Sequence, residues 1–144
     1  MQTLPQPTAA RPAVSYRQML ERVRYEGVYP TRERAEEVVR TVLGALGRQV
    51  TGEERVALAA CLPRPAARIF TAQPPENECL TGWAFVKDIA TRTGASLATT
   101  RWDVGSVLTT VAHVAGPDLT DRLLRRLPQG YALLFGRAQL AQAA

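Results

Sequence analysis

Residues 31–47 read TRERAEEVVRTVLGALG. The apolar residues of this stretch recur at the i, i+3, i+4, i+7 spacing of an α-helix that buries one face: Ala35, Val38, Val39, Val42, Leu43 and Leu46. Thr31 stands where a capping hydroxyl is expected, and Glu33 lies in the first turn, where the helix dipole favours an acid. The remaining positions are mostly charged, so the stretch predicts an amphipathic helix on the surface of a helical core.

This pattern occurs twice in the chain. Residues 16–70 can be aligned with residues 82–135. Aligned positions keep their character: Leu43 with Leu108, Leu62-Pro63 with Leu127-Pro128, and Phe70 with Phe135. We interpret the pattern as a duplication, in which residues 14–70 form repeat one, residues 71–80 a linker and residues 81–136 repeat two.

Each repeat is expected to hold four helices. In repeat one they span about 14–27, 31–47, 51–62 and 63–70, and in repeat two about 82–93, 97–114, 117–127 and 128–136. Val28 extends the apolar stripe of the first helix, Thr51 with Glu54 reads as a capping box, and Ser96 and Pro117 suit helix starts. No stretch shows the alternation of a strand. The predicted fold class is therefore all-α, with two pseudo-symmetric helical repeats packed face to face in a single compact bundle.

Several of these segments are similar to a known family. The stretch YRQMLERV at 16–23, the helix at 34–46, TGEE at 51–54 and the Leu62-Pro63 closure together resemble the bacterial domain-of-unknown-function family 2267. The resemblance covers residues 16–136, although repeat two has GPD in place of the TGE segment. It implies a helical two-repeat fold without an assigned activity, and so supplies no catalytic residues.

Composition indicates a globular protein. The 144 residues are 46% hydrophobic and 22% charged, and the net charge is +5. Every basic residue except Lys87 is arginine, as in proteins of GC-rich genomes, so the basic excess is weak evidence for a nucleic-acid partner. Residues 1–13 are expected to form a disordered arm without a signal peptide, and residues 137–144 a C-terminal tail. Since no apolar run approaches the roughly 20 residues of a membrane span, we expect a cytoplasmic protein without membrane contact.

No motif predicts catalysis, a cofactor or a metal site. Cys61 and Cys79 lack the paired spacing of zinc ligands and are expected to be free thiols. The sole histidine, His113, is predicted to face outward near the end of its helix, and Ser106 lacks the flanking glycines of a nucleophile elbow. The glycines form neither of the usual phosphate-binding patterns. We therefore predict a protein that is not an enzyme and holds neither cofactor nor metal.

A candidate basic patch comprises five arginines: Arg122, Arg125, Arg126, Arg64 and Arg68. The first three lie at i, i+3 and i+4, a spacing that converges guanidinium groups on a phosphate but is equally typical of a solvated helix face. The patch supports our alternative hypothesis, a weak and non-specific nucleic-acid binder. A helix-turn-helix at residues 31–62 is not favoured, because Gln49 and Arg55 are too few base-reading groups.

The two tryptophans lie in repeat two, where repeat one has no aromatic counterpart. We predict that the Trp83 side chain fills the core. The alternative is that it is exposed and anchors a partner protein. Trp102 aligns with Glu37 on the polar side of its helix and is predicted to be largely exposed. Flanked by Arg101 and Asp103, it forms the candidate partner surface Arg101, Trp102 and Asp103. The leading functional hypothesis is a non-enzymatic helical interaction or accessory module that binds a protein partner or associates with itself.

Overall fold

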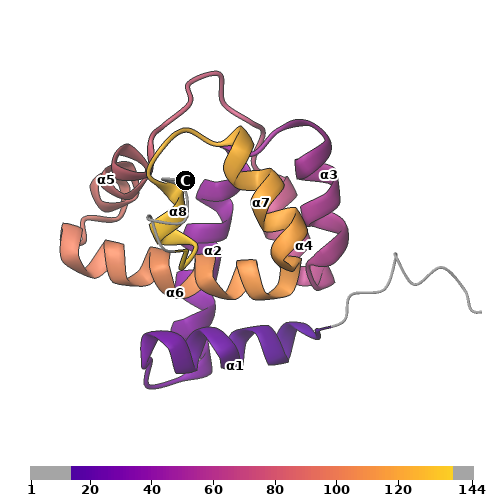
Figure 1. The fold of residues 1–144 in the computed structure, drawn as a ribbon. Coiled ribbons are helices and arrows are strands. Elements are labelled where there is room, and N and C mark those ends of the chain that lie inside the picture. Colours follow the sequence, from indigo (N-terminus) through magenta and orange to yellow (C-terminus); the bar gives the residue numbers. More distant parts are fainter. Residues whose placement is uncertain (1–13, 138–144) are drawn as a thin grey trace, which may run out of the picture.

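The structure, a computed structural model, describes residues 14–137. Within that range the chain forms eight helices and no strand (Figure 1), which confirms the all-α prediction. The helices are α1 (Tyr16–Gly27), α2 (Arg32–Gly47), α3 (Gly52–Cys61), α4 (Arg64–Ala72), α5 (Gly82–Thr93), α6 (Leu97–Ala115), α7 (Pro117–Arg126) and α8 (Tyr131–Leu134). The predicted arm at 1–13 and all of the predicted tail except Arg137 lie outside the described residues.

Most predicted helices occur close to the expected residues, and the last one is the exception. Its prediction spanned 128–136, whereas α8 has only four residues. Gly130, immediately before α8, has a φ of +99°. That left-handed conformation cannot belong to a right-handed helix, so the helix begins only at Tyr131.

Side chains cap several helices as predicted. The hydroxyl of Thr31 accepts a hydrogen bond from the Arg34 N–H, and that of Ser96 accepts one from the Thr99 N–H. The capping box predicted at Thr51 is wrong, because the Thr51 side chain makes no capping bond. Gly52 has a φ of +70°, which turns the first residue of α3 out of the geometry that such a box requires.

Helices α2 and α6 are the centre of the fold. They contact each other, α1 packs against both, α4 covers α2, and α5, α7 and α8 all contact α6. Figure 1 shows α1 beneath α6, with α5 at the opposite side of the molecule from α3 and α4. Leu43 of α2 and Leu108 of α6 are fully buried in one continuous hydrophobic core. Both halves of the chain therefore contribute to a single core, and the pseudo-symmetry of the two repeats stays a prediction.

The stripe predicted for α2 is buried throughout, but that of α1 ends earlier than expected. Val28 is 77% exposed, because it adopts a left-handed conformation that ends α1. Its N–H bonds back to the helix through the Tyr25 carbonyl. The chain then turns at Pro30 into α2.

Arg55 of α3 joins the ends of two helices. Its guanidinium donates hydrogen bonds to the carbonyl oxygens of Gly47, of Val50 at 3.1 Å and of Gln73 at 2.7 Å. It also lies over the ring of Phe70, 5.2 Å from the centroid. A cation is favourable at these positions because the carbonyl ends of α2 and α4 carry partial negative charge. Arg55 is thus a structural residue, and its polar atoms are engaged within the fold.

Candidate functional site: an apolar groove between α5, α6 and α8

Exposed apolar side chains surround a groove of about 430 Å³ between α5, α6 and α8. We call this feature the groove, and its lining residues are Gly82, Trp83, Val86, Leu97, Ala98, Arg101, Gly130, Leu133 and Leu134. Three of its side chains are unusually exposed for their type: Trp83 at 60%, Leu133 at 53% and Leu97 at 44%. Arg101 is the only charged residue of the lining.

The floor of the groove is held together by backbone contact between α5 and the turn before α8. The Gly82 N–H donates to the Gln129 carbonyl at 2.8 Å. A Cβ atom at Gly82 would overlap the backbone of Gly130, so only glycine allows this approach. The Tyr131 hydroxyl donates to the Leu80 carbonyl at 3.0 Å, and its ring packs 5.4 Å from that of Phe85. These contacts join the start of α5 to the turn before α8 and form the floor of the groove.

Trp102 lies in a smaller hollow, of about 320 Å³, that shares Arg101 and Leu133 with the groove. The indole is 54% exposed, which agrees with the prediction from helical periodicity. Its N–H donates a hydrogen bond to the Gly27 carbonyl at 2.9 Å, near the end of α1. Because the polar edge of the indole is already bonded, the exposed part of Trp102 is apolar.

Asp103 does not belong to this exposed surface, contrary to prediction. Its carboxylate is half-buried and accepts a hydrogen bond of 2.6 Å from the Tyr29 hydroxyl. Burial, helped by that bond, raises the pKa of Tyr29 above its ordinary value. Tyr29 in turn covers Gly27, where a Cβ atom would overlap the tyrosine ring. Asp103 therefore fixes the turn between α1 and α2.

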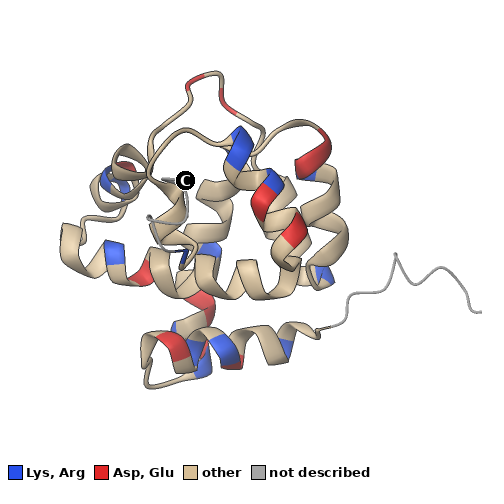
Figure 2. Ribbon diagram, in the orientation of Figure 1, with Lys and Arg blue, Asp and Glu red and all other residues tan. Residues whose placement is uncertain are grey.

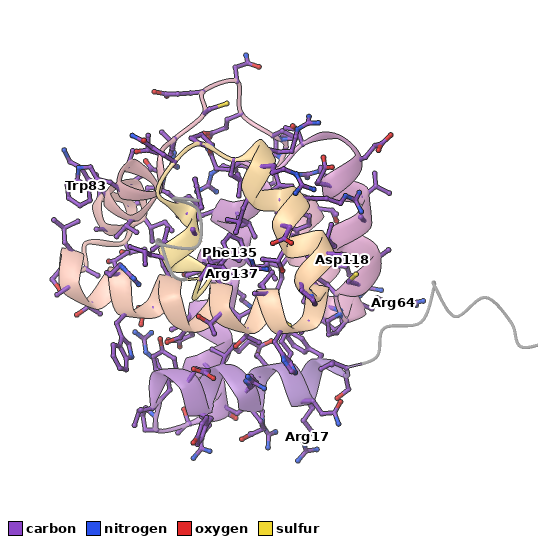
Figure 3. The ribbon with its side chains drawn as sticks, viewed as in Figure 1. Arg17, Arg64, Trp83, Asp118, Phe135 and Arg137 are labelled. Carbon is purple, nitrogen blue, oxygen red and sulfur yellow. The ribbon has the colours of Figure 1, made fainter. Side chains whose placement is uncertain are left out.

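The prediction that Trp83 fills the core is wrong. Figure 3 shows Trp83 at one edge of the molecule, with Arg64 at the opposite edge. Trp83 is the second residue of α5, whose buried side is occupied by Phe85, Val86 and Ile89. Trp83 lies outside that buried side and is 60% exposed.

The charge beside the groove is positive and unmatched. Arg101 of α6 and Lys87 of α5 have no carboxylate oxygen within 4.0 Å among residues 14–137 (basic positions in blue in Figure 2). The acid in the neighbouring hollow, Glu26, is paired with Arg22 at 3.3 Å. Gly105 makes room for Arg101, because a Cβ atom there would lie 2.8 Å from its Nη1 atom.

A family model described as "Uncharacterized conserved protein (DUF2267)" matches residues 16–134. The chain belongs to the DUF2267 family. The resemblance noted in the sequence is thereby confirmed, and the match includes every residue that lines the groove. A search of curated proteins finds no match.

Sequence reasoning missed the leucines of the groove. Leu97 is the first residue of α6 and precedes the buried stripe of that helix, which starts at Thr100. Leu133 and Leu134 are adjacent in α8, yet Leu134 is buried and Leu133 is 53% exposed. Which of the two faces the core depends on the place of α8 in the fold, for which the sequence has no local signal.

The basic patch of the DUF2267 domain is partly neutralised. Glu54 of α3 is 8% exposed, and its carboxylate lies 3.6 Å from Nε of Arg122 and 3.7 Å from Nη1 of Arg126. These two arginines of α7 therefore connect α7 to α3. The remaining three of the patch are exposed, Arg125 on α7 and Arg64 and Arg68 on α4.

Other reactive side chains of the DUF2267 domain lie apart from the groove. His113 is exposed as predicted, while Cys61 is half-buried and burial raises the pKa of its thiol. Both cysteines are free. Between residues 14 and 137, no three His, Cys, Asp or Glu side chains cluster in a way that could hold a metal ion. In the same range, no helix combines the length and apolar character needed to cross a membrane.

Proposed function

We propose that the DUF2267 domain is a non-enzymatic interaction or accessory module that binds a protein partner through the groove. The observation that carries this proposal is the gathering of Trp83, Leu97 and Leu133 around the groove, with Trp102 in the adjoining hollow that shares Leu133; each of the four is 44% exposed or more. Single exposed apolar residues are normal on a monomer, but a contiguous group marks a contact surface. Tryptophan and arginine are also the residues that most often dominate binding energy at interfaces.

The packed floor of the groove supports the same function. Its floor includes Val86 and Leu134, each 4% exposed, and is closed by the contact between Gly82 and Gly130. A preformed site loses little conformational entropy when a partner binds, so more of the contact energy appears as affinity. Trp102 adds an apolar surface whose N–H requires no partner atom.

Site-specific photo-crosslinking tests the proposal. When Leu133 is replaced by the photoreactive amino acid benzoylphenylalanine, we expect illumination of cells that make the protein to yield a covalent adduct with a specific protein. The same replacement at Val56, which is 70% exposed on α3, is the matched control and should yield none. Trp83→Ser should abolish the adduct formed at position 133. Adducts of equal yield at both positions, or none at position 133, would contradict the proposal.

Nucleic-acid binding through the basic patch is the alternative proposal. Fewer arginines of the patch are available to bind phosphate than the sequence suggests, because Glu54 faces Arg122 and Arg126. If duplex DNA binds there, log affinity should fall linearly with log salt, with a slope of about −0.9 per phosphate neutralised. Arg125→Ala should reduce that slope by about 1. A fluorescence-anisotropy titration that detects no binding at ~50 mM salt would eliminate this alternative.

A further inference from the structure

We infer that the occupant of the groove is an amphipathic α-helix of another protein, which places apolar side chains against Trp83 and Leu133 and a carboxylate against Arg101. This inference rests on the proposed function and specifies the chemistry of the partner. Three features of the groove carry it, namely its backbone, its size and its charge.

The backbone around the groove favours a helical partner. The groove lies between α5, α6 and α8, and no strand borders it in the part of the chain that the structure describes. An extended segment would bury its backbone polar groups there without an edge strand to pair with. A helix satisfies its own backbone and presents only side chains, as in other helix-in-groove complexes.

The size of the groove suits side chains from one face of such a helix. Its volume of about 430 Å³ is open to solvent rather than enclosed. Pockets of this order enclose one drug-sized molecule, equivalent to roughly two or three large apolar side chains. On a helix, residues at i, i+3 or i+4, and i+7 project from one face and would supply them.

Charge complementarity requires an acid on the partner. Covering the rim with an apolar surface would desolvate Arg101, and an uncompensated charge is costly to bury. No carboxylate of residues 14–137 lies within 4.0 Å of it, and Glu26 is engaged by Arg22. Residues 1–13 and 138–144 contain no Asp or Glu. We therefore expect the partner to supply the carboxylate that neutralises Arg101.

The experiment is a selection from a displayed library of helical peptides of about 16 residues, roughly four turns, with their surface positions randomised. The bait is the full-length protein. We expect the enriched peptides to carry apolar residues at i, i+3 or i+4, and i+7 together with Asp or Glu. Trp83→Ser in the bait should abolish binding. Arg101→Gln should weaken it about ten- to a hundred-fold, the range expected for one charge-assisted hydrogen bond. Arg64→Gln, the matched control at the opposite edge of the molecule, should have no effect.

A charge exchange sharpens the result. Arg101→Glu should abolish binding of an acidic peptide, and changing the peptide's carboxylate residue to lysine should restore it to within a few fold of the original affinity. Restoration would assign the pair of charges directly.

Each other outcome identifies which proposal fails. Peptides that need Trp83 but lack an acid, or that tolerate Arg101→Gln, would overturn this inference and leave the groove as a docking site. The absence of any Trp83-dependent peptide would overturn it as well, and the crosslink at position 133 then decides whether the proposed function also fails. Two other occupants are tested on the protein alone, by sedimentation equilibrium for a second copy and by flotation with vesicles of phosphatidylcholine and phosphatidylglycerol for a lipid surface. Trp83-dependent association in either assay would overturn the inference.

Discussion

Leu108→Ala is expected to lower the free energy of unfolding by roughly 2–5 kcal/mol, the range measured for fully buried leucines. Leu108 of α6 is 0% exposed and belongs to the hydrophobic core to which α2 and α6 both contribute. The substitution removes apolar contacts and leaves a cavity that the surrounding helices cannot fully close. Leu43→Ala in α2 should cost a similar amount, since Leu43 is also 0% exposed in the same core.

Urea titration followed by circular dichroism at 222 nm measures both effects. Leu97→Ala is the matched control, because it makes the same chemical change in the same helix at a side chain that is 44% exposed. We expect it to cost less than about 1 kcal/mol, as surface substitutions do. A cost below about 1 kcal/mol at Leu43 or Leu108 would show that the core is assigned to the wrong faces of α2 and α6.

Arg55→Ala is the second change with a large expected effect, a loss of about 2–4 kcal/mol in the free energy of unfolding. The carbonyl oxygens of Gly47, Val50 and Gln73 would lose their common donor, and Phe70 would lose the stacked guanidinium. A half-buried acceptor left without a donor costs about 1–3 kcal/mol. The Arg55 guanidinium is occupied by these contacts within the fold. We therefore expect the same loss of stability whether or not the protein binds nucleic acid.

Two companion variants separate the cause from a general effect of losing charge. Arg55→Lys keeps the positive charge, but the lysine ammonium lacks the planar set of N–H donors with which the guanidinium reaches several carbonyl oxygens. This variant should therefore recover only part of the free energy of unfolding that Arg55→Ala loses. Arg68→Ala removes an exposed arginine of α4 and should change the free energy of unfolding by less than about 0.5 kcal/mol. If Arg55→Lys is as stable as the original protein, the charge alone accounts for the role of Arg55.

The helices themselves could be predicted because their signals are local. Periodic apolar residues located α2 and α6 closely, and hydroxyl caps located their first turns at Thr31 and Ser96. Two of the errors lie where a glycine adopts a left-handed conformation, since the residue type permits that conformation without requiring it. Gly52 prevented the capping box at Thr51, and Gly130 shortened α8.

Among the candidate site residues, Trp102 and Asp103 show what helical periodicity can and cannot predict about the exposure of a side chain. Periodicity relative to the buried positions of α6 correctly predicted that Trp102 is exposed. It placed Asp103 beside Trp102 on the surface, whereas the turn after α1 brings the Tyr29 hydroxyl to within 2.6 Å of the Asp103 carboxylate. A contact between residues so distant in sequence has no local signal.

The sequence by itself determined the fold class and the face of each long helix that enters the core, because both depend on residues within one or two helical turns of one another. It also determined the family, because family membership rests on similarity in sequence. Only the tertiary structure decided which surface is left uncovered. Trp83, which follows the close contact of Gly82 with Gly130, is 60% exposed, and Arg122 and Arg126 are partly neutralised because α7 meets Glu54 of α3. The groove exists for the same reason: whether an apolar side chain is covered depends on the positions of helices that lie far from it in the chain.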